Sequence, residues 1–180
     1  MTSAARPAVL AIVGWTNSGK TTLLERLVAH FTAAGLTVST IKHAHHDLDV
    51  DQPGRDTWRH RQAGAREVIL ATSARTVVFH EHRNEPPPTL DGLLARLEPC
   101  DLVLVEGFKH APGPKLEVRR RAGGKPPIAD ADPDVIAVAS DQPIGGLQVP
   151  TFDLDDIGSI ARFVAKRILG VGPAPFKSNV

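Results

Sequence analysis

The chain has 180 residues, 42% of them hydrophobic and 23% charged, and its formal net charge is +1. This length predicts one domain, over residues 9–169, between short tails at residues 1–8 and 170–180. The near-zero charge argues against nucleic acid or a membrane surface as a partner. A single cysteine, Cys100, excludes an internal disulfide, and neither a secretion signal nor a long apolar run is evident, so we expect a cytoplasmic protein.

The first expected element is a buried strand over residues 9–13, which are all apolar. It leads into GWTNSGKT, residues 14–21, which matches the pattern G-x-x-x-x-G-K-[ST] at every position. A helical pattern follows over residues 22–34. A strand, a glycine-bounded loop and a helix in this order are the context of a phosphate-binding loop and predict an α/β fold with a mostly parallel central sheet flanked by helices.

The residue types in this loop suit a nucleotide triphosphate. Glycines allow the backbone N–H groups to turn inward, and the following helix adds its positive N-terminal end. Lys20 would reach the β- and γ-phosphates, and the hydroxyl of Thr21 would bind Mg²⁺. The expected phosphate contacts are Gly14, Thr16, Asn17, Ser18, Gly19, Lys20, Thr21 and Thr22.

The next strand is expected over residues 36–41, and the loop KHAHHDLDVD, residues 42–51, begins where it ends. Ligands of open α/β sheets bind beyond the carboxyl ends of strands, so we expect this loop beside the phosphates, with Lys42 and His43 among the nucleotide contacts. Two alternatives are a transition-metal site, built on the loop's histidines, and a solvated polar loop. The histidines and aspartates of the loop are His43, His45, His46, Asp47, Asp49 and Asp51.

The middle of the chain predicts a helix over residues 56–63, two strands over residues 67–71 and 76–79 joined by a tight turn, and a helix over residues 89–97 with Thr89 as its N-cap. Arginines around the first of these helices could hold an anionic substrate, but a solvated helix face explains them equally.

The stretch DLVLVEG, residues 101–107, reads as a buried strand with a carboxylate at each end. Nucleotide hydrolases hold Mg²⁺ with an acidic residue at the carboxyl end of such a strand, and this end faces the phosphate loop. We therefore choose Glu106 over Asp101 and expect Lys20, Thr21 and Glu106 to carry the chemistry. Gly107 would allow close approach to the γ-phosphate.

Hydrophobic and charged residues alternate over residues 115–121, KLEVRRR, which predicts a half-exposed strand. We expect it to form a projecting hairpin over residues 115–129 that pairs with a second copy of the chain. An alternative is that Arg119–Arg121 form a lid over the phosphates, as in small kinases.

The last expected elements are a strand over residues 134–139, a short strand over residues 149–152 and a closing helix over residues 153–169. Asp141 follows the first of them. A carboxylate there can accept two hydrogen bonds from guanine N1–H and N2–H₂ and would reject adenine, so Asp141 is a candidate guanine reader.

The segments GWTNSGKTTL, TIKHAHHDLDVDQPGRDTWRHRQAGA, LVLVEGFK, PKLEV and IAVASD resemble the molybdopterin-guanine dinucleotide biosynthesis protein B family over nearly the whole chain. This resemblance implies a homodimeric GTP-binding protein with weak GTPase activity. It assists the guanylyltransferase partner that joins GMP to molybdopterin, and molybdopterin itself is a second candidate ligand. By position, residues 14–22 bind phosphate, Thr21 and Glu106 hold Mg²⁺, Asp141 reads guanine and the hairpin is the dimer arm.

Three other classes share the phosphate loop. A nickel-insertion GTPase predicts tight Ni²⁺ or Zn²⁺ binding that depends on His43, His45 and His46. A small-molecule kinase predicts rapid phosphoryl transfer to a metabolite with little release to water. A non-enzymatic scaffold predicts GTP binding without hydrolysis.

Overall fold

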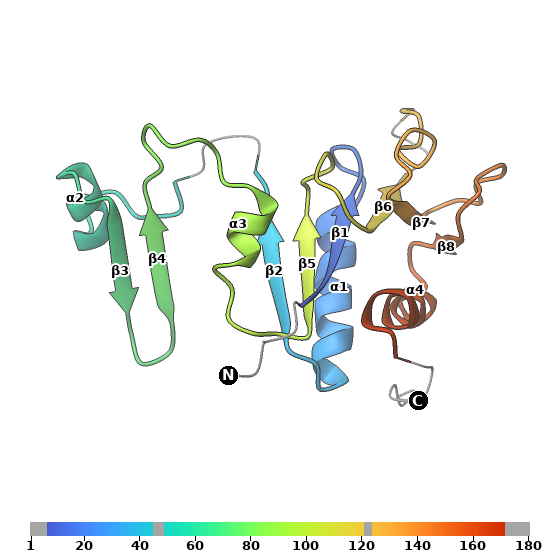
Figure 1. The fold of residues 1–180 in the computed structure, drawn as a ribbon, viewed down its shortest axis with the longest axis horizontal. Coiled ribbons are helices and arrows are strands. Elements are labelled where there is room, and N and C mark those ends of the chain that lie inside the picture. Colours follow the sequence, from blue (N-terminus) through green and yellow to red (C-terminus); the bar gives the residue numbers. More distant parts are fainter. Residues whose placement is uncertain (1–6, 45–48, 121–123, 172–180) are drawn as a thin grey trace. The chain divides into compact units, whose positions relative to one another are not determined.

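The computed structural model describes residues 7–44, 49–120 and 124–171. The chain forms two compact units, a larger one that contains residues up to His43 and from Leu93 onward, and a smaller one over Ala44–Gly92. The elements of both are labelled in Figure 1. The helix α3 (Leu90–Leu94) lies where the smaller unit gives way to the larger, and it is shorter than expected. The hydroxyl of Thr89 accepts a hydrogen bond from the Gly92 amide at 3.1 Å, as the predicted N-cap requires.

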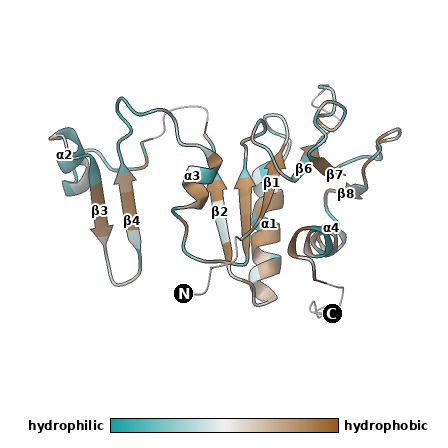
Figure 2. Cartoon of the chain, in the orientation of Figure 1, coloured by the Kyte–Doolittle hydropathy of each residue, from teal (hydrophilic) through white to brown (hydrophobic). Residues whose placement is uncertain are grey.

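The larger unit is built on a six-stranded sheet in the order β2-β5-β1-β6-β7-β8, and every neighbouring pair is parallel. The predicted α/β class with a parallel central sheet is therefore confirmed. The strands are β1 (Ala8–Val13), β2 (Val38–Lys42), β5 (Leu102–Glu106), β6 (Lys115–Arg119), β7 (Val135–Ser140) and β8 (Thr151–Asp153). Figure 2 shows β1 and β5 coloured as hydrophobic, as strands buried on both faces should be.

Helices α1 and α4 supply the rest of the core. The helix α1 (Lys20–Ala33) buries Leu23, Leu27 and Phe31, which recur at helical spacing. The predicted closing helix is α4 (Ile157–Val164), whose N-cap is Asp156, continued by the π-helix η2 (Ala165–Leu169). The two helices pack with the strands into one hydrophobic cluster. Among the described residues, no helix has the length and apolar character needed to cross a bilayer.

The predicted half-exposed strand and hairpin over residues 115–129 are wrong. The strand β6 lies inside the sheet between β1 and β7, parallel to both. Two of its three charged residues are buried rather than solvated, with Lys115 3% and Glu117 0% exposed, and Arg119 is partly buried. The Lys115 ammonium pairs with Asp132 at 2.7 Å, and the Glu117 carboxylate accepts hydrogen bonds from the amides of Ile128 and Ala129 at 3.0 and 2.9 Å. The segment expected to return antiparallel in the hairpin therefore bonds to the Glu117 side chain and not to the backbone of a neighbouring strand.

The smaller unit contains the helix α2 (Asp56–Gln62) and an antiparallel pair, β3 (Glu67–Ala71) and β4 (Thr76–His80), all close to their predicted bounds. A four-residue turn joins the strands, with the Thr72 amide bonded to the Arg75 carbonyl at 2.9 Å. Figure 2 shows both strands as hydrophobic. Three of their apolar side chains are exposed: Ile69 at 61%, Leu70 at 43% and Val78 at 54%.

Candidate nucleotide-binding site

The loop between β1 and α1 has the backbone shape of an anion cradle. Gly14, Asn17 and Gly19 have positive φ angles of 151°, 62° and 98°. A Cβ atom on Gly14 would lie 2.4 Å from the Val118 carbonyl oxygen and 2.6 Å from the Ser18 hydroxyl. Because β6 is packed so closely against the loop, only glycine fits at position 14.

Lys20 is the first residue of α1 and directly follows this loop. Its Nζ donates a hydrogen bond to the carbonyl oxygen of Trp15 at 2.8 Å. Partial burial lowers the pKa of Lys20; the carboxylate of Glu106 opposes this effect and the charge of Lys42 adds to it. The ammonium group is therefore already partly dehydrated, so that less hydration is lost when it meets a phosphate.

Helix α1 and the ends of strands β2 and β5 bring Thr21, Lys42 and Glu106 together. The parallel register pairs Glu106 of β5 with Ile12 of β1 on one side and with Lys42 of β2 on the other. The carboxylate of Glu106 accepts hydrogen bonds from the Thr21 hydroxyl at 2.9 Å and from Lys42 Nζ at 3.0 Å. A hydroxyl and a carboxylate in contact offer the oxygen ligands that Mg²⁺ requires.

The competing carboxylate, Asp101, belongs to the opposite end of β5. It accepts hydrogen bonds from the amide and the hydroxyl of Thr37 at 2.8 and 2.6 Å, and so ties the start of β5 to the residues before β2. These bonds lower the pKa of Asp101. Asp101 therefore stabilises the fold by its hydrogen bonds to Thr37.

The structure explains why position 107 is a glycine, by a contact that the sequence did not predict. A Cβ atom on Gly107 would lie 3.0 Å from the Cβ of His43. The His43 amide donates to the Glu106 carbonyl at 2.9 Å, and the rings of His43 and Phe108 lie 4.5 Å apart. The glycine therefore lets His43 lie directly beside the end of β5.

A basic pocket of about 280 Å³ adjoins the phosphate loop. Its lining joins the loop to the carboxyl end of β6 and consists of Trp15, Thr16, Asn17, Ser18, Val118, Arg119, Arg120 and Lys125. Lys109 and Lys125 lie over the Trp15 ring at 5.0 and 4.7 Å. Two buried polar atoms, Ser18 Oγ and Arg119 Nη1, have no hydrogen-bond partner within the described part of the chain, and both suit an anion.

The sequence did not predict that Lys109 and Lys125 contact the Trp15 ring beside this loop. The basic run Arg119–Arg121 at the end of β6 indicates an anion site, but the sequence pattern predicts this run in the projecting hairpin. Arg119 and Arg120, two of the three arginines proposed as a lid, do lie at the phosphate loop. Arg121 falls outside the described residues.

Of the other predicted site residues, some belong to the larger unit, some belong to the smaller unit and some fall outside the described residues. Thr22 is exposed on α1, and Asp141 is exposed directly after β7, at the same carboxyl edge of the sheet as the phosphate loop. In the 42–51 loop, His45, His46 and Asp47 fall outside the described residues. Asp49 and Asp51 belong to the smaller unit, where both pair with Arg61 at 2.8 and 3.0 Å.

A protein-family model described as molybdopterin guanine dinucleotide synthesis protein B, MobB, matches residues 9–141. The chain belongs to the MobB family. The matched segment contains the phosphate loop, Lys42, Glu106, the basic end of β6 and Asp141. The family resemblance expected from the sequence is therefore confirmed.

Two curated relatives align with most of the chain. The molybdopterin-guanine dinucleotide biosynthesis adapter protein of Escherichia coli K12 is 41% identical over 161 residues, which are 88% of this chain and 91% of the relative. The adapter protein of the same description from Haemophilus influenzae is 40% identical over 158 residues, 87% of this chain and 86% of the relative.

Solved MobB structures share the fold. The crystal structure of Bacillus subtilis MobB superposes with a TM-score of 0.71 at 27% identity and covers 91% of this chain and 99% of its own. A crystal structure of molybdopterin-guanine biosynthesis protein B gives a TM-score of 0.70 at 27% identity, covering 88% and 98%.

Proposed function

We propose that this MobB-family chain is a GTP-binding adapter with weak, Mg²⁺-dependent GTPase activity. It acts in molybdopterin-guanine dinucleotide biosynthesis, where it assists the guanylyltransferase that attaches GMP to molybdopterin. The observation that carries the nucleotide part is the phosphate loop of residues 14–21 with Glu106 in contact with Thr21. The adapter role is supported by the names of the Escherichia coli and Haemophilus influenzae relatives.

In this proposal the loop amides and Lys20 hold the β- and γ-phosphates, and Thr21 and Glu106 hold Mg²⁺, directly or through water. The ion would neutralise charge that develops on the phosphate oxygens during hydrolysis. Water attacks the γ-phosphorus in line, the bond to the bridging oxygen breaks, and GDP and phosphate leave. His43 and Asp47 are the candidates for orienting that water. We expect turnover near that of unassisted GTPases, on the order of 10⁻³–10⁻² per second.

Three further parts of the proposal concern ligands and partners. Asp141 selects guanine over adenine, because its carboxylate can accept both guanine donors. Molybdopterin is a second ligand, for which the basic pocket beside Trp15 is the candidate place. The chain also acts as a homodimer, and the exposed apolar side chains of β3 and β4 support this.

Calorimetric titration with GTP and Mg²⁺ tests the nucleotide site. Lys20→Ala should lower GTP affinity on the order of 100-fold, because it removes a charged hydrogen bond to phosphate in a partly dehydrated place. Lys166→Ala, which changes an exposed lysine on η2, is the matched control and should bind GTP like the natural chain. Equal GTP affinity of the Lys20→Ala variant and the control would contradict the assignment of the loop.

A further inference from the structure

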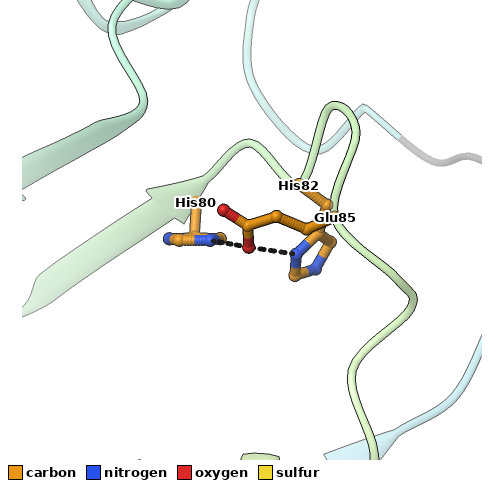
Figure 3. Close-up of side chains that lie close together, drawn as sticks. All are labelled: His80, His82 and Glu85. Carbon is orange, nitrogen blue, oxygen red and sulfur yellow. Dashed lines mark hydrogen bonds and ion pairs between the residues drawn. The ribbon is translucent and has the colours of Figure 1, made fainter.

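A cluster of two histidines and one glutamate lies at the end of β4 in the smaller unit. In the sequence it is well separated from the residues of the nucleotide site. Figure 3 shows His80, His82 and Glu85 with their side chains turned toward one another. One possible ligand atom from each residue lies within 4.8 Å of the other two. We propose that His80, His82 and Glu85 form a binding site for a divalent transition-metal ion, with Zn²⁺ as the occupant that their chemistry suits.

The local backbone explains how three nearby residues converge. His80 is the last residue of β4, and the turn after it contains Arg83 in the left-handed conformation, with φ 49°. The Glu85 amide then donates to the His82 carbonyl at 2.7 Å. The turn thus brings Glu85 back over the end of the strand, between the two imidazole rings.

The distances fit a small coordination sphere. His80 Nε2 and the Glu85 carboxylate are 3.3 Å apart, and His82 Nδ1 lies 4.0 Å from the same carboxylate oxygen. Ligand atoms around tetrahedral Zn²⁺, at bond lengths near 2.0–2.1 Å, are roughly 3.4 Å apart. One of the three pairs therefore already has the required separation. A shift of His82 by roughly 0.6 Å would bring its Nδ1 to that distance from Glu85, and the ligand atoms of His80 and His82, which lie within 4.8 Å of each other, would also have to approach.

A second carboxylate orients His80 as metal-binding histidines are oriented. Glu67 is the cross-strand neighbour of His80 in the β3–β4 register, and its carboxylate lies 3.1 Å from His80 Nδ1. When Nδ1 donates its proton to Glu67, the lone pair of Nε2 is directed at the position between His80 and Glu85. This is the carboxylate–histidine–metal arrangement found around protein zinc ions.

The side-chain environment favours a transition metal over Mg²⁺. Two imidazoles and one carboxylate suit Zn²⁺ or Ni²⁺, whereas Mg²⁺ prefers oxygen ligands alone. The other oxygen of Glu85 pairs with Arg66, which leaves Oε2 for the ion. Three protein ligands leave a fourth position for water or an external donor.

The site is tested by titrating the tag-free, metal-stripped full chain with Zn²⁺ in competition with a chromophoric chelator. His82→Ala and Glu85→Gln should each bind one equivalent of Zn²⁺ fewer than the natural chain. His60→Ala, which changes an exposed histidine on α2, is the matched control and should keep that equivalent. Far-ultraviolet circular dichroism of each variant checks that the fold is retained. If all four proteins bind the same amount of Zn²⁺ with the same affinity, the cluster is an ion-pair network and the proposal is overturned.

Two further variants separate this site from its rivals. Glu67→Gln keeps all three ligands but loses the orienting carboxylate, and should weaken Zn²⁺ binding about 10- to 100-fold. Changing His43, His45 and His46 together should leave the equivalent intact, whereas its loss there would move the metal to the 42–51 loop and overturn the proposal. Lys20→Ala should lose GTP but retain Zn²⁺, so failure of the nucleotide proposal and failure of this one are distinguishable.

Discussion

At the residue scale, we propose that Asp141 selects the base that the nucleotide site accepts. It follows β7 at the carboxyl edge of the sheet, on the side to which the phosphate loop belongs. Asp141→Asn replaces one acceptor oxygen by a donor amide, so GTP should bind about 10-fold or more weakly. Xanthosine triphosphate should gain, because its extra carbonyl can accept from the new amide. Competition titrations of the two nucleotides measure the ratio, and an unchanged ratio would remove Asp141 from the base site.

At the scale of single elements, β6 depends on Glu117. This side chain is 0% exposed and accepts the amides of Ile128 and Ala129. Glu117→Ala would leave both amides without that acceptor and open a cavity, so the free energy of unfolding should fall by about 3 kcal/mol. Glu117→Gln retains one acceptor oxygen and should cost less. Urea denaturation compares the three proteins, and equal midpoints for Glu117→Ala and the natural chain would contradict the bonding described for β6.

The start of β5 provides a pH-dependent prediction at the same scale. Hydrogen bonds from Thr37 lower the pKa of Asp101 in the folded chain. A depressed carboxyl pKa adds stability at pH values above the pKa of the unfolded chain, and that stability is lost as pH falls through the folded value. Asp101→Asn should therefore melt below the natural chain at neutral pH, and the two melting curves should converge in acid. A constant gap down to acid pH would rule out ionisation of Asp101 as the cause.

At the scale of the whole molecule, the antiparallel pair is the surface we assign to the dimer. Ile69 and Val78 are directly paired across β3 and β4, and both are more than half exposed. A second copy that covers them would remove this apolar area from water. Light scattering after gel filtration should give a dimer for the natural chain and a monomer for Ile69→Lys with Val78→Lys. Val171→Lys, at an exposed position of the larger unit, should remain dimeric. A monomeric natural chain, or a dimeric double variant, would refute this surface.

Features set by local chemistry were predictable from the sequence, and features set by distant partners were not. The phosphate loop, β1 and α1 follow from glycine spacing and apolar runs within about twenty residues of one another. The burial of β6 does not, because alternating charges look the same whether water or a partner such as Asp132 receives them. The convergence of His80, His82 and Glu85 is not predictable from the sequence either, for a related reason. Their convergence depends on the positive φ of Arg83, and a positive φ cannot be predicted at a position that is not glycine.

The contact between Thr21 and Glu106 joins residues that are 85 positions apart in the chain. At about 5–20 residues per second, a ribosome needs roughly 4–17 s to proceed from one to the other. Both strands that flank β1, namely β5 and β6, are translated after it. In a nascent chain, the residues of β1 and the phosphate loop are therefore synthesised several seconds before either strand that flanks β1. During that time only helix α1 or a chaperone can shield the apolar side chains of β1 from water.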